Sequence, residues 1–260
     1  MRRTEGVQVS RSSGVQARPP EHLNTRTLEH RFRGWASPWG KSLLAVLLLV
    51  AAHPQAGTRA AAPPIQLQAA LTGDRARTGE SELGNLVADA LRSATSADIA
   101  LVAAGELREE SLPAGSCTVD QLQHLLANGD EPVAVLSLSG STLRGALEVA
   151  VNLYPYKNKG FLQVSGMRFT FDPARPEGSR VVARTVGGQP MQDGRQYRVA
   201  MSSALASGQY GYYRLWNREK AAAQGLTMAG ALDQYLRDHR TLAPHPEGRV
   251  VAAPTAGRRR

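Results

Sequence analysis

The sequence predicts one mixed α and β domain after a leader. Short apolar runs typical of strands alternate with stretches in which apolar residues recur at helical spacing. The chain beyond residue 60 is long enough to bury a core as a single domain. Its one cysteine, Cys117, permits no internal disulfide, so packing must hold the fold together.

The first part of this domain predicts a strand, a helix and a second strand. Apolar and polar residues alternate over 65–71, as in a half-buried strand. Apolar residues then repeat at helical spacing over 83–91, and Glu80 and Glu82 precede them, where the helix dipole favours acidic groups. Residues 99–103 are a continuous apolar run, which predicts a buried strand.

The second part begins with a capping signal. Thr118 is followed by Gln121, a capping box that predicts a helix through Leu125 and Leu126, ended by Pro132. Periodicity and Gly- or Pro-rich turns predict the remaining elements, which are strands at 133–138, 162–172, 180–186 and 197–202 and helices over 140–150 and 228–235.

Residues 1–60 have the features of a leader with a signal peptide. The apolar region 43–52 follows Lys41 and precedes small residues, the layout of a secretory signal. Its length is below the roughly 20 residues that a bilayer-spanning helix needs. We therefore expect cleavage between Ala56 and Ala62 and a periplasmic or secreted protein. The mature chain should consist of a domain over 61–251 and a disordered basic tail over 252–260. An uncleaved membrane anchor is the alternative.

The distribution of charge argues against a nucleic-acid partner. The formal net charge is +9, but residues 1–60 hold 9 Lys or Arg against 3 Asp or Glu, and three arginines end the chain. Residues 61–257 hold 19 charges of each sign. A neutral domain lacks the basic footprint of a nucleic-acid-binding protein.

Several exact words of the sequence point to one family. They are ESELGNLVADA at 80–90, ADIAL at 97–101, GSTL at 140–143 with LE at 147–148, FLQVSG at 161–166 and GQYGY at 208–212. With these words, in family order, the chain resembles the C-terminal domain of 5′-nucleotidases over about residues 65–251. The resemblance implies a four-layer α/β/β/α fold with mixed sheets, which in the family binds the substrate and follows a separate metallophosphoesterase domain that performs the chemistry.

The sequence does not supply that chemistry. A two-metal phosphoesterase needs His, Asp and Asn ligands, which the family provides in Asp-x-His and Gly-Asn-His words, and neither word occurs here. Ser165 lacks the Gly-x-Ser-x-Gly elbow of a serine hydrolase. We expect no metal site, no cofactor and no catalytic residue, so hydrolase activity of this chain alone is not predicted. The sequence has six histidines, and none lies in either metal-binding word: His22, His30, His53, His124, His239 and His245.

The resemblance implies a ligand-binding role for four residues. Arg77 and Arg108 match family arginines that grip the polar part of a nucleotide, and arginine suits this role because its planar fork binds phosphate bidentately. Tyr212 falls at the second aromatic position of the family's base clamp, and Tyr210 replaces a family aspartate. The alternatives are a solvated or Glu109-paired arginine and ordinary packing for Tyr212.

Three departures from the family pattern weaken the expected pocket. Ala103 replaces an asparagine, and AGE at 104–106 replaces three glycines. Glu106 would place a carboxylate beside Arg108 and repel an anion. Asn128 lies where the first clamp aromatic is expected, and no aromatic is found there.

These observations predict an exported, stand-alone domain that binds a nucleotide or small anion. One alternative is the substrate-binding half of a split 5′-nucleotidase, completed by a separate metallophosphoesterase chain. A second alternative is a structural or interaction domain with a decayed pocket, which the departures at Ala103, Glu106 and Asn128 favour. Separately, Tyr212, Tyr213 and Trp216 lie close together in the sequence and would form an exposed aromatic patch for a partner.

Overall fold

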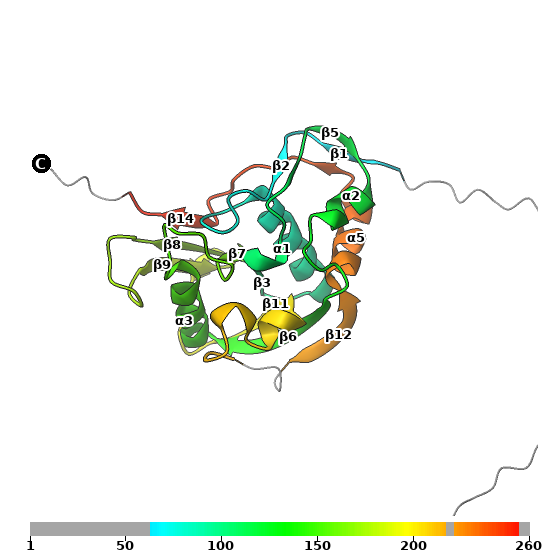
Figure 1. The fold of residues 1–260 in the computed structure, drawn as a ribbon. Coiled ribbons are helices and arrows are strands. Elements are labelled where there is room, and N and C mark those ends of the chain that lie inside the picture. Colours follow the sequence, from blue (N-terminus) through cyan, green and yellow to red (C-terminus); the bar gives the residue numbers. More distant parts are fainter. Residues whose placement is uncertain (1–62, 217–220, 255–260) are drawn as a thin grey trace, which may run out of the picture. The chain divides into compact units, whose positions relative to one another are not determined.

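The computed structural model describes residues 63–216 and 221–254 (Figure 1). The predicted leader, residues 1–60, and residues 255–260 of the predicted tail lie outside the described residues. Among the described residues, no helix combines the length and apolar character needed to cross a membrane.

A five-stranded mixed sheet forms the centre of the domain. Its strand order is β12 (Ala222–Thr227), β6 (Pro132–Ser139), β11 (Gln196–Ser202), β3 (Ile99–Ala103) and β7 (Leu162–Ser165). β11 runs parallel to β3 and antiparallel to β6. Every residue of β3 is buried, which explains its continuous apolar sequence, because a central strand covered on both faces has no solvent side.

Three smaller sheets surround the central one. The four-stranded sheet has the order β10 (Gln189–Pro190), β9 (Val181–Val186), β8 (Met167–Phe171) and β14 (Val250–Ala252). The others are β13 (Thr241–Leu242), β1 (Ile65–Leu67) and β5 (Gly115–Cys117), and the pair β2 (Leu71–Thr72) and β4 (Ser111–Leu112). β14 runs parallel to β8 and β9 antiparallel to it, so this sheet is mixed as well.

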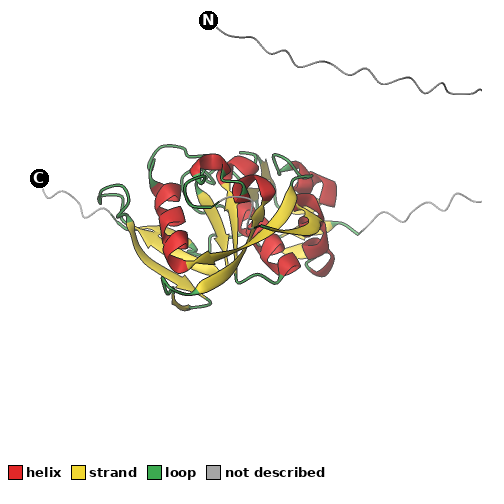
Figure 2. Ribbon diagram, turned by 90° about the horizontal axis from the view of Figure 1, so that it is seen from below, coloured by secondary structure: helices red, strands yellow, loops and turns green. Residues whose placement is uncertain are grey.

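Helices cover these sheets (Figure 2). They are α1 (Glu82–Thr95), α2 (Val119–His124), α3 (Gly140–Val151), α4 (Ser203–Ala206) and α5 (Met228–Asp238), with 3-10 turns η1 (Ala104–Glu106) and η2 (Gln209–Gly211). α1 packs on β3 and β7, α5 packs on α1, and α3 packs on β6 and β9. The predicted mixed α and β class is confirmed.

Most boundaries follow the sequence signals, and the exceptions have local causes. The Thr118–Gln121 capping box is present in both directions. α2 nevertheless ends at His124, because the next two leucines turn inward and Leu126 bridges Leu107. The predicted strand 162–172 is two strands: Gly166 has φ 76° and lies so close to the Asp98 carbonyl that a Cβ would be 2.1 Å from its oxygen.

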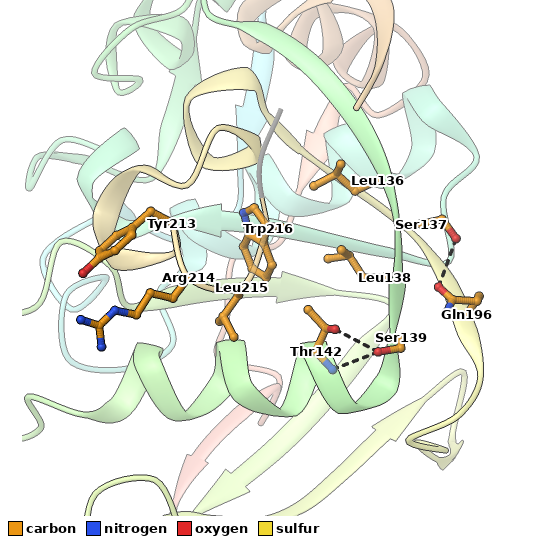
Figure 3. Close-up of a pocket in the computed structure, with 10 residues that line it drawn as sticks. All are labelled: Leu136, Ser137, Leu138, Ser139, Thr142, Gln196, Tyr213, Arg214, Leu215 and Trp216. Atoms are coloured by element: carbon orange, nitrogen blue, oxygen red, sulfur yellow. Dashed lines mark hydrogen bonds between the residues drawn. The ribbon is translucent and has the colours of Figure 1, made fainter. Parts of the chain in front are cut away.

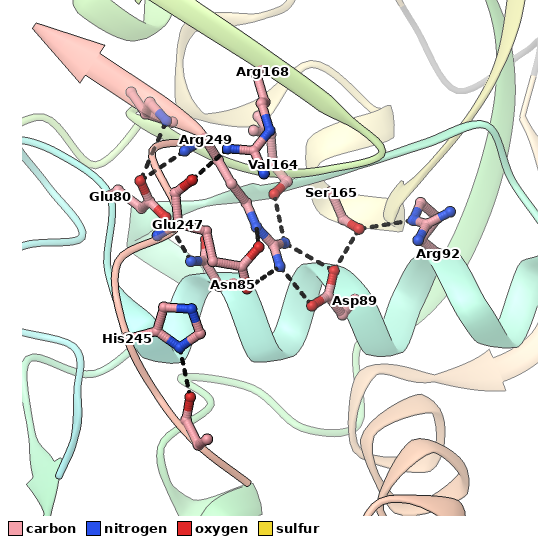
Figure 4. Close-up of polar contacts among 12 residues, drawn as sticks. Glu80, Asn85, Asp89, Arg92, Val164, Ser165, Arg168, His245, Glu247 and Arg249 are labelled. Carbon is pink, nitrogen blue, oxygen red and sulfur yellow. Dashed lines mark hydrogen bonds and ion pairs between the residues drawn. The ribbon is translucent and has the colours of Figure 1, made fainter. Parts of the chain in front are cut away.

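Hydrogen-bonded polar groups join α1 to the rest of the domain, and we call them the polar frame (Figure 4). Its residues are Glu80, Ser81, Asn85, Asp89, Gln163, Ser165, Glu247 and Arg249. Figure 4 labels all of them except Ser81 and Gln163. All but Glu247 and Arg249 lie in the family words at 80–90 and 161–166. The polar residues of these two family words therefore have a structural role in the polar frame.

Gln163 fixes the start of α1 and the turn before it. Its Oε1 accepts a hydrogen bond from the Ser81 amide at 2.9 Å, and its Nε2 donates to the carbonyls of Ala76 and Gly79, both at 2.8 Å. A Cβ on Gly84 would lie 2.3 Å from the Gln163 side chain, so the glycine makes room for this contact. The turn held in this way carries Arg77.

The other half of the frame ties α1 to the C-terminal segment. Glu80 accepts hydrogen bonds from the side chain of Asn85 at 2.7 Å and from the backbone amides of Glu247 and Arg249 at 2.7 and 2.8 Å. Burial opposes the charge of Glu80, but these bonds outweigh burial and lower its pKa. The Arg249 guanidinium, 8% exposed, donates to both carboxylate oxygens of Asp89 at 2.8 and 2.7 Å.

Candidate ligand-binding site

Hydrogen bonds bring together the segments that the sequence selects for ligand binding. The turn carrying Arg77 accepts at its carbonyl from the Asn158 amide at 2.9 Å. The loop after β3 is joined to the next segment by the Gly105 amide, which donates to the Lys159 carbonyl at 2.8 Å. The Arg108 amide donates to the Leu125 carbonyl at 2.9 Å. Four chain segments thus meet beside the C-terminal end of β3.

Arg77 belongs to a small charged cluster. Its Nη1 lies 3.6 Å from Oε2 of Glu109, and Nζ of Lys157 lies 2.9 Å from the other oxygen. The hydrogen bond from Lys157 is the main cause of the lowered pKa of Glu109, and Arg77 adds to it. Glu109 thus forms ion pairs with both Arg77 and Lys157, although 27% of the Arg77 side-chain surface remains exposed.

Arg108 is the more open of the two predicted arginines. Its side chain is 42% exposed, its Nε donates to the Leu126 carbonyl at 3.3 Å, and its Nη1 lies 3.9 Å from Glu110. A pair this long and exposed contributes little to stability. Most of the guanidinium therefore remains available to an anion, and it is positioned by the backbone of the loop after α2.

Glu106 turns into the domain and does not pair with Arg108 among the described contacts. Its Oε2 accepts from the Ala103 amide at 2.9 Å, and its Oε1 accepts a short hydrogen bond from the Ser202 hydroxyl. Burial raises the pKa of Glu106 to about 7, although both hydrogen bonds oppose the shift. We expected the Glu106 carboxylate to lie beside Arg108 and repel an anion, and this placement is wrong. The carboxyl group is hydrogen-bonded to Ala103 and Ser202 in the core instead.

Tyr210 lies over the loop after β3 in an unusual backbone conformation. Its φ is 60° and ψ 20°, and its ring packs so closely on Gly105 that a Cβ there would lie 2.6 Å from the ring. Tyr210 and Glu106 line a pocket of about 160 Å³ that also includes Asn128. Burial, followed by the charge of Glu106, raises the pKa of Tyr210, so its hydroxyl is a hydrogen-bond donor here.

Neither arginine lines this pocket, whose other residues are Ala127, Glu131, Ala204, Gln209 and Met228. The structure therefore places the cationic groups and the aromatic group in adjoining regions rather than in one cavity. The pocket itself offers carboxyl, amide and phenol groups. Such groups suit an uncharged polar ring better than a phosphate, because they supply donors and acceptors without positive charge.

Tyr212 occupies a packing position. Its side chain has no exposed surface, its ring stacks on Trp216 with centroids 5.0 Å apart, and its hydroxyl donates to the Gly160 carbonyl at 2.5 Å. No ring face is open to a ligand in this arrangement, so the packing alternative describes Tyr212. The adjacent Tyr213 is 65% exposed instead.

The surface next to Tyr210 is rich in apolar side chains. Leu153, Tyr156 and Tyr213 are 48%, 77% and 65% exposed. Two of them, Leu153 and Tyr213, border a depression of about 540 Å³ that also includes Tyr210. The predicted aromatic patch of Tyr212, Tyr213 and Trp216 is wrong for two of its three members, because Tyr212 and Trp216 are buried and Tyr213 is exposed. Leu153 and Tyr156, far away in sequence, are exposed as well.

A further pocket, of about 290 Å³, lies between β6 and the chain at 213–216 (Figure 3). Its lining combines hydroxyl and amide groups with the indole of Trp216, whose Nε1 is already bonded to the Leu205 carbonyl at 2.7 Å. None of Arg77, Arg108 and Tyr210 is among its lining residues. Hence it forms no part of the predicted site.

The described residues also provide no set of metal ligands. Across residues 63–216 and 221–254, no three His, Cys, Asp or Glu side chains gather closely enough to hold a metal ion. The donors in these residues therefore do not fit a two-metal phosphoesterase site.

Comparison with known proteins gives the family. A family model described as "5'-nucleotidase, C-terminal domain" matches residues 56–216. The chain belongs to this family. A 5'-nucleotidase of Diplobatis ommata is 29% identical over 200 residues, covering 69% of this chain and 34% of the relative. A snake venom 5'-nucleotidase of Naja atra is 28% identical over 196 residues, covering 67% and 37%.

Solved structures agree with this family assignment. The 5'-nucleotidase precursor from Thermus thermophilus superposes with a TM-score of 0.68 at 30% identity, covering 74% of this chain and 40% of that one. The chain thus spans 34% to 40% of the length of these 5'-nucleotidase relatives. The fold predicted from the family words, that of a 5'-nucleotidase C-terminal domain with mixed sheets, is confirmed.

Proposed function

We propose that this 5'-nucleotidase C-terminal domain binds a nucleotide or a related small anion and leaves hydrolysis to another protein. The anionic part would lie at Arg108, with Arg77 nearby, and the base or sugar would lie in the pocket beside Tyr210 and Glu106. The observation that carries the proposal is Arg108, which is held by backbone contacts yet is 42% exposed and loosely paired.

Calorimetric titration of the chain with adenosine, AMP and phosphate tests this proposal. We expect AMP to bind with micromolar affinity and Arg108→Ala to weaken AMP about 10-fold, a loss of about 1.4 kcal/mol, while adenosine binding changes little. Tyr210→Ala should weaken both adenosine and AMP, because stacked or edge contacts to a base are worth about 1–3 kcal/mol.

Arg144→Ala is the matched control, since Arg144 is also about half exposed and pairs with a carboxylate, Asp193, at 3.4 Å. It should leave AMP affinity unchanged. Absence of heat with all three ligands would reject the proposal and favour the decayed-pocket alternative. Equal losses in the Arg108 and Arg144 variants would show a non-specific charge effect.

A second candidate is the substrate-binding half of a split 5'-nucleotidase. The exposed side chains Leu153 and Tyr213, which border one depression with Tyr210, favour it, because an apolar surface next to a ligand site suits a protein partner. Tyr156, in the same turn as Leu153, is also exposed. Metal-dependent hydrolysis of AMP by a co-purified phosphoesterase, enhanced by this chain and not by its Tyr156→Ser, Tyr213→Ser variant, is the expected result. Phosphatase activity of the pure chain with added divalent metal would contradict both candidates.

We also propose that the protein is exported, which the signal-like segment 43–52 supports. A relative from snake venom is consistent with export. Fractionation of cells that express the full chain should place a shortened product outside the cytoplasm, with its new N-terminus between residues 56 and 62; an unprocessed cytoplasmic product would contradict export.

A further inference from the structure

Another polar pocket borders the polar frame, because Asn85, Asp89 and Glu247 line it. It has a volume of about 200 Å³ and is formed by α1, α5 and the segment around β13. Apolar side chains at Leu71, Leu86 and Leu242 form part of its wall. It shares no lining residue with the pocket beside Tyr210.

Asn85 contributes an unused acceptor to this pocket. Its side-chain Nδ2 donates to Glu80 at 2.7 Å, which fixes the orientation of the amide because a carboxylate only accepts from it. The amide oxygen Oδ1 is then the free end, and among the described residues it receives no hydrogen bond. Asn85 is 5% exposed, so this oxygen is a buried acceptor without a donor, an arrangement that destabilises the domain unless a ligand supplies the hydrogen bond.

Glu82, one turn earlier on the same face of α1, contributes a second unused acceptor. Its Oε2 is buried and has no hydrogen-bond partner in the described part of the chain, while the side chain as a whole is partly exposed. The side chains of both residues line the pocket, so its wall contains two acceptors that no group in the described part of the chain satisfies.

The remaining polar groups keep the pocket negative. The pocket lining holds three carboxylates, Glu82, Asp89 and Glu247, and no lysine or arginine, while Arg249 pairs with Asp89 and Glu247 from outside the lining. The Nδ1 of His245 lies 2.8 Å from the Ala243 carbonyl and donates to it, because a carbonyl oxygen only accepts. Figure 4 shows this imidazole beside the part of α1 that carries Asn85.

Tyr235 of α5 forms the aromatic part of the pocket wall. Its ring stacks on His239 at a centroid distance of 4.0 Å, and both residues line the pocket. Burial is the main cause of the raised pKa of Tyr235; the charges of Asp89 and Glu247 raise it further, whereas those of Arg249 and Arg92 lower it. The pocket therefore combines an apolar and aromatic wall with acceptors and excess negative charge.

From this geometry we propose that the pocket binds a small organic cation, with a guanidinium or ammonium head that donates to Glu82 and Asn85 and a short apolar body against Leu86 and Leu242. A head with several N–H donors can satisfy acceptors spread along the pocket. The same residues do not gather as metal ligands, since no group of three His, Cys, Asp or Glu in the described residues does so.

Titration of the full chain with n-butylguanidinium, and with the neutral and similarly shaped n-butylurea, tests the proposal. We expect n-butylguanidinium to bind with a Kd of about 1 mM and n-butylurea at least about 10-fold more weakly. Amide chemical-shift changes should cluster at residues 82–89 and 235–247. Equal binding of the two probes, changes located elsewhere, or no saturation by about 20 mM would overturn the proposal.

Glu82→Gln keeps the size of the side chain and removes its charge, so it should weaken n-butylguanidinium about 10-fold. Asp120→Asn is the control, because Asp120 is likewise an acidic residue in the first turn of a helix, α2, but does not line the pocket. It should leave the Kd unchanged. An unchanged Kd in Glu82→Gln, or an equal loss in Asp120→Asn, would overturn the proposal.

Discussion

The polar frame and the candidate site use arginine in opposite ways. In the frame, Arg249 is 8% exposed and reaches its carboxylate partners at 2.7 and 2.8 Å. At the site, Arg77 and Arg108 are 27% and 42% exposed, and their carboxylates lie 3.6 and 3.9 Å away. The first arrangement is a closed hydrogen-bonded unit, whereas the second is an open cluster with unused donors.

The buried arginine of the frame contributes to stability, whereas the exposed arginines of the site are suited to ligand recognition. Removing one partner from a buried ion pair leaves an uncompensated charge and is costly, whereas an exposed pair is worth little and exchanges readily for another anion. Two of the family words of the sequence, at 80–90 and 161–166, supply most of the frame. The residues with binding capacity lie in loops that the frame holds in place.

The largest expected effect is on the frame itself. Arg249→Met should lower the free energy of unfolding by about 3–5 kcal/mol, because Asp89 and Glu247 are left without their shared cation. Urea denaturation measures this. In the control Arg237→Met, which removes an exposed pair with Asp233 on α5, the change should stay below about 0.5 kcal/mol. Similar losses in both variants would erase the distinction between frame and surface.

A pH-dependent effect should follow at Glu106, between the two regions. Its pKa is about 7 in the folded chain against an ordinary 4.5, so the folded state holds this proton more tightly than the unfolded state. Its contribution to stability is full below about pH 4.5, decreases as the pH rises to about 7 and is constant above. The total change is about 3 kcal/mol.

Glu106→Gln should remove this pH dependence. Urea denaturation of both proteins at about pH 5 and pH 8 gives the difference, and wild type should lose about 2–3 kcal/mol more than the variant between these values. The control Glu110→Gln, at an exposed carboxylate, should behave as wild type. Parallel pH profiles of wild type and Glu106→Gln would contradict a raised pKa.

Packing inside the frame should give a smaller loss. Gly84→Ala places a Cβ 2.3 Å from Gln163, whose side chain is held by three backbone partners. Overpacking costs about 1–3 kcal/mol and the helical alanine returns up to about 1. We expect a net loss of about 1–2 kcal/mol in thermal or urea unfolding, whereas Gly145→Ala on α3, which meets a flexible leucine end at 3.1 Å, should be close to neutral.

The smallest effect on stability should come from Glu109→Gln, which frees Arg77 and Lys157. Unfolding should change by less than about 0.5 kcal/mol. If the proposed function is correct, the affinity for phosphate should rise about 5-fold because the internal competitor is gone. Asp233→Asn, at the exposed pair on α5, should change neither quantity. A lower phosphate affinity in Glu109→Gln would show that Glu109 supports the site.

Local patterns predicted much of the fold. The helix at α1, the capping box of Thr118 and the buried strand β3 follow from periodicity and capping rules that act within a few residues. Strand β12 was not predicted, because AAQGLT lacks a strand period; its pairing with β6 supplies the missing specificity. The break at Gly166 depended on the Asp98 carbonyl, which is distant in sequence.

The candidate site was less predictable than the fold. Family position selected Arg77, Arg108, Tyr210 and Tyr212, but it could not distinguish a ring that packs, Tyr212, from its exposed neighbour Tyr213. The signal that was missed is Gly105, whose small size makes room for the Tyr210 ring. The need for a glycine at position 105 arises from its contact with Tyr210, which lies in a distant loop, so the local sequence could not indicate it.

By itself, the sequence determined the family, the mixed α and β class and the local helix starts, because these depend on short-range periodicity, capping and exact words. The tertiary structure decided which polar groups are buried and paired. Burial depends on segments far apart in the chain: Ser202 and Ala103 turn Glu106 inward, and the C-terminal Arg249 neutralises Asp89. The charge available to a ligand is what remains after those pairings, so only the folded chain could define it.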